Sequence, residues 1–285
     1  LLHPPLLPGD IFLKKQIIWI LLGIVAMIGT SFIDYRIFRS RGAIIFIVYG
    51  FAIFLLGLLL LIGSKVRGVE GWFQFGDIFL QPAEFLKIIL IILLAKYFSR
   101  RYIELYRWQH IIISGSYIIL PAILLMLQPD LGSVIVIVGI WILLMIFAGI
   151  PWKKLVALGI IFMVSMALLW SFILAPYQKS RITHFLNPWA DPRGGGYQTI
   201  QSMIAVGAGG LWGEGIGYGT QSHLHFLPEP ETDFIFATFA EEWGYIGSIS
   251  ILLIFLFLCW RLLYRARAAS NNFAQFFILG YLFLI

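Results

Sequence analysis

Residues 43–63 read AIIFIVYGFAIFLLGLLLLIG, an uncharged apolar run of about the 20 residues that an α-helix needs to cross a bilayer. The runs of this kind are continuous rather than alternating, and lipid offers the backbone no hydrogen-bond partner, so we expect every span to be helical. With 60% hydrophobic residues, 12% charged residues and a mean hydropathy of +0.92, the chain is predicted to be all-α, a polytopic membrane helix bundle. The other runs lie at 16–33, 80–98, 109–127, 131–149, 155–175 and 234–262, with an eighth from Phe273.

The positive charges predict the orientation of these helices. Twelve of the 20 lysines and arginines fall in alternate loops, which the positive-inside rule assigns to the cytoplasm. Twelve of the 14 acidic residues then lie outside, together with the segment before Gln16. The net charge of +6 therefore follows membrane orientation, and its distribution argues against nucleic-acid binding. Because the sequence lacks an initial methionine and its last apolar run stops at Ile285, we expect a single membrane domain over 1–285, truncated at both ends.

Two segments on the predicted outer side, 63–81 and 176–232, stand out from the other connections. The second is a large outer loop, longer than the 12 to 15 residues beyond which a loop is usually functional or disordered. Its pattern from Tyr197 to Val206 predicts an amphipathic helix at the membrane interface. One face of that helix carries Gln198, Gln201, Ser202 and Ala205, with Tyr197, Ile200, Met203 and Ile204 turned mostly away.

Seven glycines follow within residues 207–219, GAGGLWGEGIGYG. A nucleotide-binding loop would need a preceding strand or a Gly-Lys-Ser/Thr ending, and the sequence has neither. We therefore expect a flexible or tightly turned loop that faces the substrate.

Ionisable residues lie at the predicted outer ends of two helices. In QPAEFLK, residues 81–87, Glu84 and Lys87 share a helix face. They are either an ion pair that fixes the helix against its neighbours, or a cation facing an anionic headgroup with an acid that tunes it. In QPDLGS, residues 128–133, Asp130 is interpreted first as an N-terminal cap and second as a site residue.

Residues 226–244, FLPEPETDFIFATFAEEWG, place acids beside an apolar helix. If Thr232 caps this helix, Asp233 lies in its first turn, either as a cap or as a general base whose ionised form the helix N-terminus favours. Glu241 stands about 12 Å further along the axis, too far to form a catalytic carboxylate pair with Asp233. One face, expected to meet a cavity, carries Asp233, Ala237, Ala240, Glu241, Gly244 and Ser248.

A metal-ligand cluster is not evident from the sequence. The nearest candidate set lacks the helical spacing that paired histidine ligands usually show, so a structural or surface role is the better interpretation. That set is His223, His225, Glu229 and Glu231.

Three stretches together resemble the SEDS (shape, elongation, division, sporulation) family of peptidoglycan glycosyltransferases. They are the run from Asp191 to Gly247, the segment GVEGWFQFGDIFLQPAEFLK at 68–87, and QPDLGS at 128–133. The order GTQS then FLPE is closer to the RodA branch than to the FtsW branch. The resemblance covers nearly the whole chain, and it departs from the family pattern at Glu231, where His is usual, and at Gly71, where Arg is usual.

The resemblance implies a bundle of about ten helices, of which this chain would hold about eight: the second through eighth and part of the ninth. It implies a multi-pass protein of the bacterial cytoplasmic membrane that polymerises lipid II on the outer face during cell elongation and shape maintenance. Asp233 would be the catalytic acid of the Thr-Asp-Phe motif, with Trp72, Glu84 and Lys87 in the same outward cavity. The implied partners are a class B penicillin-binding protein, as transpeptidase, and other elongation-complex membrane proteins.

The resulting hypothesis is an inverting glycosyl transfer between lipid II and an undecaprenyl-linked glycan. Asp233 accepts the proton of the acceptor 4-hydroxyl as its oxygen attacks the anomeric carbon of the donor, and a diphosphate leaves. Lys87, Arg181 and then Arg193 are the cations available to that diphosphate, and a divalent cation (Mg²⁺ or Mn²⁺) could assist. Glu231 is predicted to tune the site, and Glu241 is predicted to be either a tuning or a structural group. The predicted substrate-binding residues are Trp72, Glu84, Lys87, Asp130, Arg181, Gln198, Gln201, Ser202 and Gln221.

Two other function classes stay open at this point. A lipid II flippase would also be polytopic, but it predicts charges through the depth of the bilayer, whereas these charges gather at outer helix ends. A non-catalytic scaffold that recruits a transpeptidase is the third interpretation.

Overall fold

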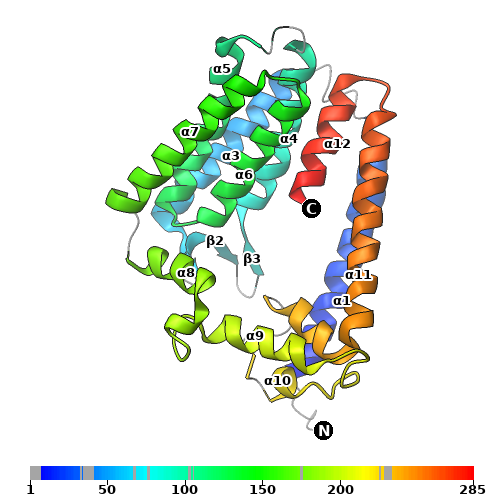
Figure 1. Ribbon diagram of the computed structural model, residues 1–285. Coiled ribbons are helices and arrows are strands. Elements are labelled where there is room, and N and C mark those ends of the chain that lie inside the picture. The colour runs from blue at the N-terminus through cyan, green and yellow to red at the C-terminus, as the bar shows by residue number, and fades with distance from the viewer. Residues whose placement is uncertain are drawn as a thin grey trace. The chain divides into compact units, whose positions relative to one another are not determined.

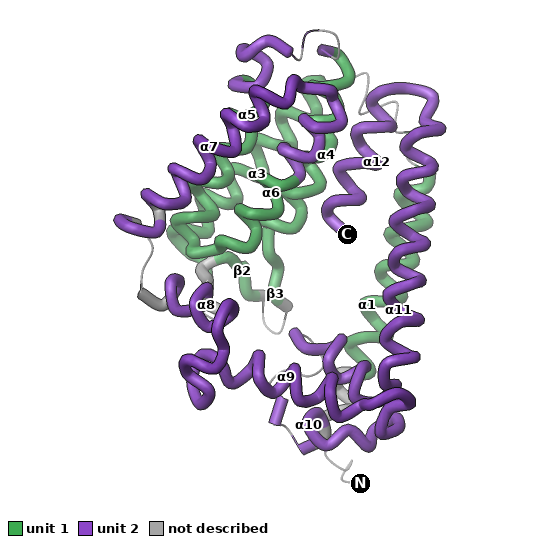
Figure 2. Tube along the Cα trace, viewed as in Figure 1, with its two compact units in different colours: residues 1–100, 113–139 green, residues 101–112, 140–285 purple. Residues whose placement is uncertain are grey.

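The structure is a computed structural model in which helices dominate (Figure 1). It divides into two compact units, residues 1–100 with 113–139 (unit 1) and residues 101–112 with 140–285 (unit 2) (Figure 2). The residues that the structure describes are 8–32, 34, 42–66, 69–75, 78–101, 104, 106–173, 176–224, 226–227 and 233–285.

Unit 1 is built around α4 (Pro82–Arg101). Buried side chains lie on all sides of this helix, among them Leu86, Leu90 and Ile91, which is the pattern of a helix enclosed by others. Leu56 and Leu125, from the two neighbouring apolar runs, are equally buried. The other helices of the unit, wholly or in part, are α1 (Pro8–Ser31), α3 (Gly42–Ile62), α5 (Trp108–Leu127) and α6 (Leu131–Phe147).

A short antiparallel sheet follows α3 and packs against it through β2. Its strands are β1 (Ser64–Val66), β2 (Val69–Phe75) and β3 (Ile78–Leu80), in that order across the sheet. The sequence pattern predicts only a loop at 63–81, because β1 and β3 have three residues each, and Gly71 and Trp72 interrupt the apolar and polar alternation of the seven-residue β2.

Unit 2 contains the large predicted loop at 176–232, whose described part is mostly helical. The longest helix of the unit, α11 (Ile235–Arg267), packs against both α12 (Asn272–Leu284) and α9 (Tyr197–Ala208) (Figure 1). The remaining elements are α7 (Trp152–Leu168), the π-helix η2 (Leu169–Ile173), α8 (Pro176–Leu186), the 3₁₀-helix η3 (Pro188–Ala190) and α10 (Thr220–His223).

The predicted all-α membrane fold is confirmed. Five of the described helices are long and apolar enough to cross a membrane. The apolar α6 and α12 are shorter, and α4 carries charged residues. The five candidate spans are Leu13–Ser31, Gly42–Ile62, Trp108–Leu127, Trp152–Phe172 and Ile235–Arg267.

The helix α11 is not continuous, although the sequence pattern predicts one span at 234–262. Its 33 residues would measure about 50 Å, more than the roughly 30 Å of bilayer hydrocarbon. Gly244 interrupts the helix with φ 65° and ψ −164°. The part after the break, residues 245–267, is about 34 Å long and can cross a membrane by itself.

Candidate active site

Asp233 is exposed and lies just before α11. The helix begins at Ile235, with Phe234 as its N-cap at φ −118° and ψ 26°. Asp233 therefore precedes the first turn, whereas the sequence pattern predicts it within that turn. The difference arises because the backbone of Phe234 is not helical. Thr232, the predicted cap, and Glu231 lie outside the described residues.

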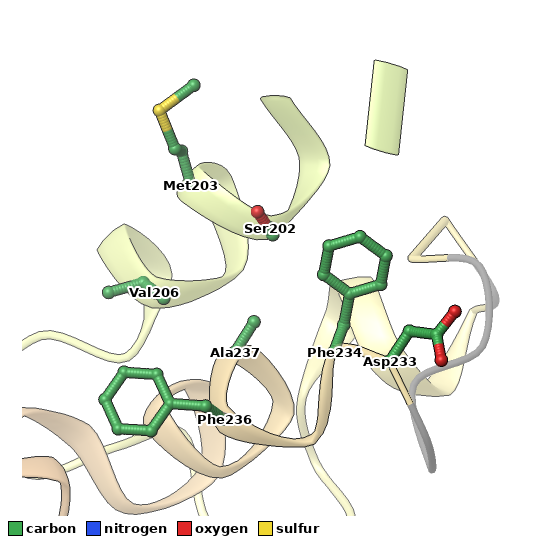
Figure 3. A pocket seen from close by; sticks show the side chains of 7 residues that line it. All are labelled: Ser202, Met203, Val206, Asp233, Phe234, Phe236 and Ala237. Carbon is green, nitrogen blue, oxygen red and sulfur yellow. The ribbon is translucent and has the colours of Figure 1, made fainter. Parts of the chain in front are cut away.

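Asp233 lines a cavity of about 360 Å³ between the start of α11 and α9 (Figure 3). Ser202 is the other polar residue of the lining. In Figure 3 the carboxylate stands at one edge of the group and points away from Met203 and Val206. The arrangement joins an acid at the rim to a mostly apolar interior, so a ligand could place a polar group at Asp233 and apolar atoms inside. The remaining lining residues are Met203, Val206, Phe234, Phe236 and Ala237.

Beneath this cavity α9 and α11 meet through small side chains. Ala205, Ala237 and Leu227 form a buried cluster, and Phe234 packs against it. Alanine at both positions allows the two helix backbones to approach closely. The residue beside Asp233 is thus fixed by a core that includes Leu227, from the loop after α10.

The polar face predicted for α9 is only partly reproduced. Ser202 lines the cavity and Ala205 is buried, but Gln201 is half-buried and Gln198 is exposed. Ile200, predicted to turn away from that face, is also buried. The reason is that α9 packs against η3 and α10 as well as α11, which covers more than one of its sides.

The sequence pattern predicts that Glu241 faces a cavity. In the structure its side chain is instead completely buried (0% exposed). Its carboxylate accepts the backbone N–H groups of Gln221, at 2.7 Å, and Ser222, at 3.1 Å. The hydroxyl of Thr220 donates to it at 3.5 Å. These donors belong to the first turn of α10, where backbone N–H groups have no partner within the helix. Gln221, predicted to bind substrate, therefore contacts Glu241 through its backbone.

Residues 207–219, named here the glycine segment, bind across the break in α11. On one side of the break, Glu214 N–H donates to the carbonyl of Glu241 at 2.9 Å, and Gly215 N–H donates to that of Glu242 at 3.1 Å. The Glu242 carboxylate accepts the Gly217 N–H at 2.9 Å. The break thus leaves helix carbonyls free, and the glycine segment supplies their donors.

The other side of the break is satisfied in the same way. Tyr245 N–H donates to the carbonyl of Gly210 at 2.9 Å, and Ile246 N–H donates to that of Leu211 at 3.3 Å. The glycine segment is therefore a docked, tightly turned element. The sequence signal for the break was Gly244, the glycine of EEWG, because an isolated glycine in a helical pattern argues against an unbroken helix.

Two glycines show why the contact needs this residue type. Gly213 has φ 85°, and a Cβ there would lie 2.0 Å from the Glu242 carbonyl oxygen. Gly244 has φ 65°, and a Cβ there would lie 2.3 Å from the Gly213 nitrogen. Any side chain at either position would combine a disfavoured backbone conformation with a collision.

In unit 1, Glu84 and Lys87 form the predicted ion pair at the start of α4. Lys87 Nζ lies 2.6 Å from Glu84 Oε1, with the Lys87 side chain 10% exposed and that of Glu84 56% exposed. Trp72, on β2, is half-buried and packs edge-on against Phe79 of β3, with ring centroids 6.3 Å apart. The ammonium group is thus held from one side by an acid that faces solvent.

Asp130 has the contacts of a helix cap. Its carboxylate accepts the backbone N–H of Ser133 at 3.1 Å and the Ser133 hydroxyl at 2.7 Å, in the first turn of α6. The amide of Gln81 donates to it at 3.1 Å, which links the starts of α4 and α6. Nearby, the Gln128 amide donates to the carbonyl of Leu56 at 2.7 Å. The two Gln-Pro pairs of the sequence therefore supply side chains that join one helix to another.

The predicted site residues fall in both units. Trp72, Glu84, Lys87 and Asp130 belong to unit 1, and the others belong to unit 2. Arg181 lies in α8, but its side chain is outside the described residues, as are His225, Glu229 and the side chain of His223. Arg193 is exposed in the turn before α9. Within the described residues, no group of three or more His, Cys, Asp or Glu is placed to hold a metal ion.

Comparisons with known proteins agree with this architecture. Residues 8–285 match the family FTSW_RODA_SPOVE, described as "Cell cycle protein". Stage V sporulation protein E of Bacillus subtilis (strain 168) is 37% identical over 277 residues, which cover 96% of this chain and 74% of that protein. Peptidoglycan glycosyltransferase MrdB of Escherichia coli (strain K12) is 32% identical over 263 residues, 92% of this chain and 70% of that protein.

A solved structure described as "Structural coordination of polymerization and crosslinking by a peptidoglycan synthase complex" has the same fold. It superposes with a TM-score of 0.79 at 27% identity and covers 96% of this chain and 76% of its own.

Proposed function

We propose that this chain, which belongs to the FTSW_RODA_SPOVE family of cell cycle proteins, is a peptidoglycan glycosyltransferase that polymerises lipid II, with Asp233 as its general base. The reaction class is supported by a curated relative named peptidoglycan glycosyltransferase. The role of Asp233 is carried by one observation: its exposed carboxylate stands at the rim of a mostly apolar cavity.

The proposed step is an inverting transfer. The 4-hydroxyl oxygen of the acceptor sugar forms a bond to the anomeric carbon of the donor, and the bond from that carbon to the donor diphosphate breaks. Asp233 takes the hydroxyl proton, and the diphosphate leaves with its lipid carrying the bonding electrons. General base catalysis of this kind typically contributes about 10²- to 10⁴-fold in rate.

The negative charge that develops on the diphosphate requires a cation. Lys87 supports this role because its ammonium group is fixed by Glu84 while most of that acid remains in solvent. Arg181 is the second proposed cation, and a divalent ion could share the work. The remaining predicted contacts to substrate, including Trp72 and Gln198, are proposed because these residues lie in the sequence stretches that resemble the SEDS family.

Further parts of the proposal concern location and partners. We place the reaction at the outer face of the bacterial cytoplasmic membrane, on the strength of the charge distribution in the loops. The partner is a class B penicillin-binding protein, which is supported by the likeness to a peptidoglycan synthase complex. A role in cell elongation follows from the GTQS and FLPE motifs. Because relatives named for sporulation and for glycosyl transfer match to a similar degree, overall identity does not select the branch.

The experiment is polymerisation of lipid II by the full-length protein with its partner in detergent, where no membrane sidedness exists. Wild type, Asp233→Asn and the control Asp34→Asn would be compared by the length and amount of glycan strands. We expect polymer from wild type and from the control, because Asp34 is exposed in a loop whose arginines assign it to the cytoplasmic side, away from the predicted outer site, and none from Asp233→Asn.

Each other outcome selects a different function. Polymer from wild type and from Asp233→Asn alike would overturn the base assignment. An absence of polymer from every protein would favour a flippase or a scaffold, and transport of lipid II across sealed vesicles would then distinguish these two.

A further inference from the structure

Glu241 is the most deeply buried acid among the described residues, and its carboxylate is hydrogen-bonded to the first turn of α10. Both carboxylate oxygens are occupied by backbone N–H groups of Gln221 and Ser222, at 2.7 and 3.1 Å. Each bond satisfies a backbone donor that has no partner within the helix. Glu241 therefore holds the first turn of α10, a helix of four residues that could not form by itself.

The turn that Glu241 holds leads back to the proposed base. Leu227 N–H donates to the carbonyl of Gln221 at 3.0 Å, which ties the end of the loop to α10. Leu227 is fully buried against Ala205 and Ala237, in the cluster that also supports Phe234. Phe234 is the neighbour of Asp233 in the chain (Figure 3). A continuous series of contacts thus joins the Glu241 carboxylate to Phe234, the chain neighbour of Asp233.

Glu241 is also linked, through its backbone, to the break in α11. Its own backbone carbonyl accepts the Glu214 N–H, and Glu214 in turn accepts the N–H of Thr220, at 3.2 Å. The middle of the connection between α9 and α10 and the first turn of α10 are therefore both bonded to Glu241. A side-chain substitution at Glu241 would release the first turn of α10, whereas the backbone bond to Glu214 and the apolar core between α9 and α11 would remain.

From these contacts we infer that Glu241 is a positioning residue, whose bonds to α10 fix the place of Asp233 at the rim of the cavity. The inference rests on the proposed function, since it assigns Glu241 a part in the same reaction. It differs from a tuning role, in which Glu241 would act on the charge of Asp233 through space. A displacement of about 1 Å of a catalytic group can cost about 100-fold in rate.

Two substitutions disturb the contact in independent ways. Glu241→Gln keeps one acceptor oxygen but turns an N–H₂ group toward a backbone N–H. Gly219→Ala leaves the acid intact but places a Cβ 2.6 Å from Ser222 Oγ and 2.7 Å from Glu241 Oε2, and so separates the carboxylate from the first turn of α10. Gly219 has φ −59°, so alanine there adds no backbone strain. Glu242→Gln is the matched control, because the Glu242 carboxylate binds Gly217 and not α10.

The measurements use the full-length protein with its partner. We expect Glu241→Gln and Gly219→Ala each to lower the single-turnover rate about 10- to 100-fold, with lipid II binding changed by less than about threefold. The pH profile should keep its shape under a lower maximum. Amide hydrogen exchange should rise at residues 226–238 in both variants and remain at the wild-type level there in Glu242→Gln.

The outcomes distinguish failure of the positioning role of Glu241 from failure of the proposed glycosyltransferase function. Wild-type rates in both variants would overturn the positioning role alone. A shift of the acidic limb of the profile would assign tuning instead, and a fall in thermal stability with an unchanged rate per folded molecule would assign a purely structural role. Absence of polymer from wild type would overturn the proposed function and this inference together.

Discussion

The acids of unit 1 and those at the break in α11 use their carboxylates in different ways. Glu84 binds Lys87, three residues away, and Asp130 binds Ser133, also three residues away. Glu241 instead binds residues 19 and 20 positions earlier, and Glu242 binds one 25 positions earlier. Glu84 acts within one turn of its helix, and Asp130 caps its own helix while also accepting a bond from Gln81, whereas the acids at the break bind only distant segments of the chain.

This difference indicates at which acids an effect on stability can be separated from an effect on function. A local cap can be replaced by another capping residue, because its partner is part of the same turn. A long-range contact depends on every element between its ends, including the glycine segment. Asp233 belongs to neither group by position, since it is exposed and precedes its helix, and that leaves it accessible to a substrate.

The largest effect is expected from Gly213→Ala. The substitution combines a positive φ, which costs about 1 to 3 kcal/mol for a side-chain-bearing residue, with the collision at the Glu242 carbonyl. We expect a clear fall in the thermal unfolding temperature of the purified protein in detergent, together with loss of polymerisation.

Gly207→Ala is the control for that prediction. Gly207 lies in α9, and a Cβ there would have no atom within 4 Å. Alanine should therefore raise helix stability by about 0.5 to 1 kcal/mol. If both alanine variants behave alike in thermal unfolding, the glycine segment is not docked as described.

An intermediate effect is expected at Asp130. Removal of a cap by Asp130→Ala should cost about 0.5 to 2 kcal/mol, and Asp130→Ser should restore most of it because serine also caps. Chemical denaturation of the two variants measures this difference. Equal loss of stability in Asp130→Ala and Asp130→Ser would contradict the cap, and strongly reduced polymerisation by a fully stable Asp130→Ser would add the alternative, a contact to substrate.

The smallest effect on stability is expected from the Glu84 and Lys87 pair. Because Glu84 is largely exposed, a double-mutant cycle with Glu84→Gln and Lys87→Gln should give a coupling of about 1 kcal/mol or less. Polymerisation should fall with Lys87→Gln whether or not Glu84 is present. Recovery of polymerisation in the double variant would show that the pair is purely structural.

Much of the helical fold could be predicted from the sequence, and for a simple physical reason. A bilayer requires long apolar helices, so each span leaves a continuous run that is visible by inspection. The ion pair of Glu84 with Lys87 and the cap at Asp130 were predictable as well, because spacings of three residues are set by helix geometry.

The remaining features depend on contacts that spacing does not encode. Nothing in EEWG indicates that Glu241 meets Gln221, and the glycine segment suggested a substrate loop because its partner, the break at Gly244, was not expected. The small sheet was missed because two of its strands have three residues and the seven-residue β2 does not alternate cleanly. Small residues on one face of α11 were correctly grouped, but only Ala237 of them lines the cavity with Asp233, and Gly244 meets the glycine segment instead.

The most direct test of the central claim is the single-turnover rate of Asp233→Asn on lipid II, measured together with its affinity for lipid II. An amide cannot accept the hydroxyl proton, so we predict a rate lower by about 10²- to 10⁴-fold and an affinity within about threefold of wild type. A wild-type rate would contradict the assignment of Asp233 as the base.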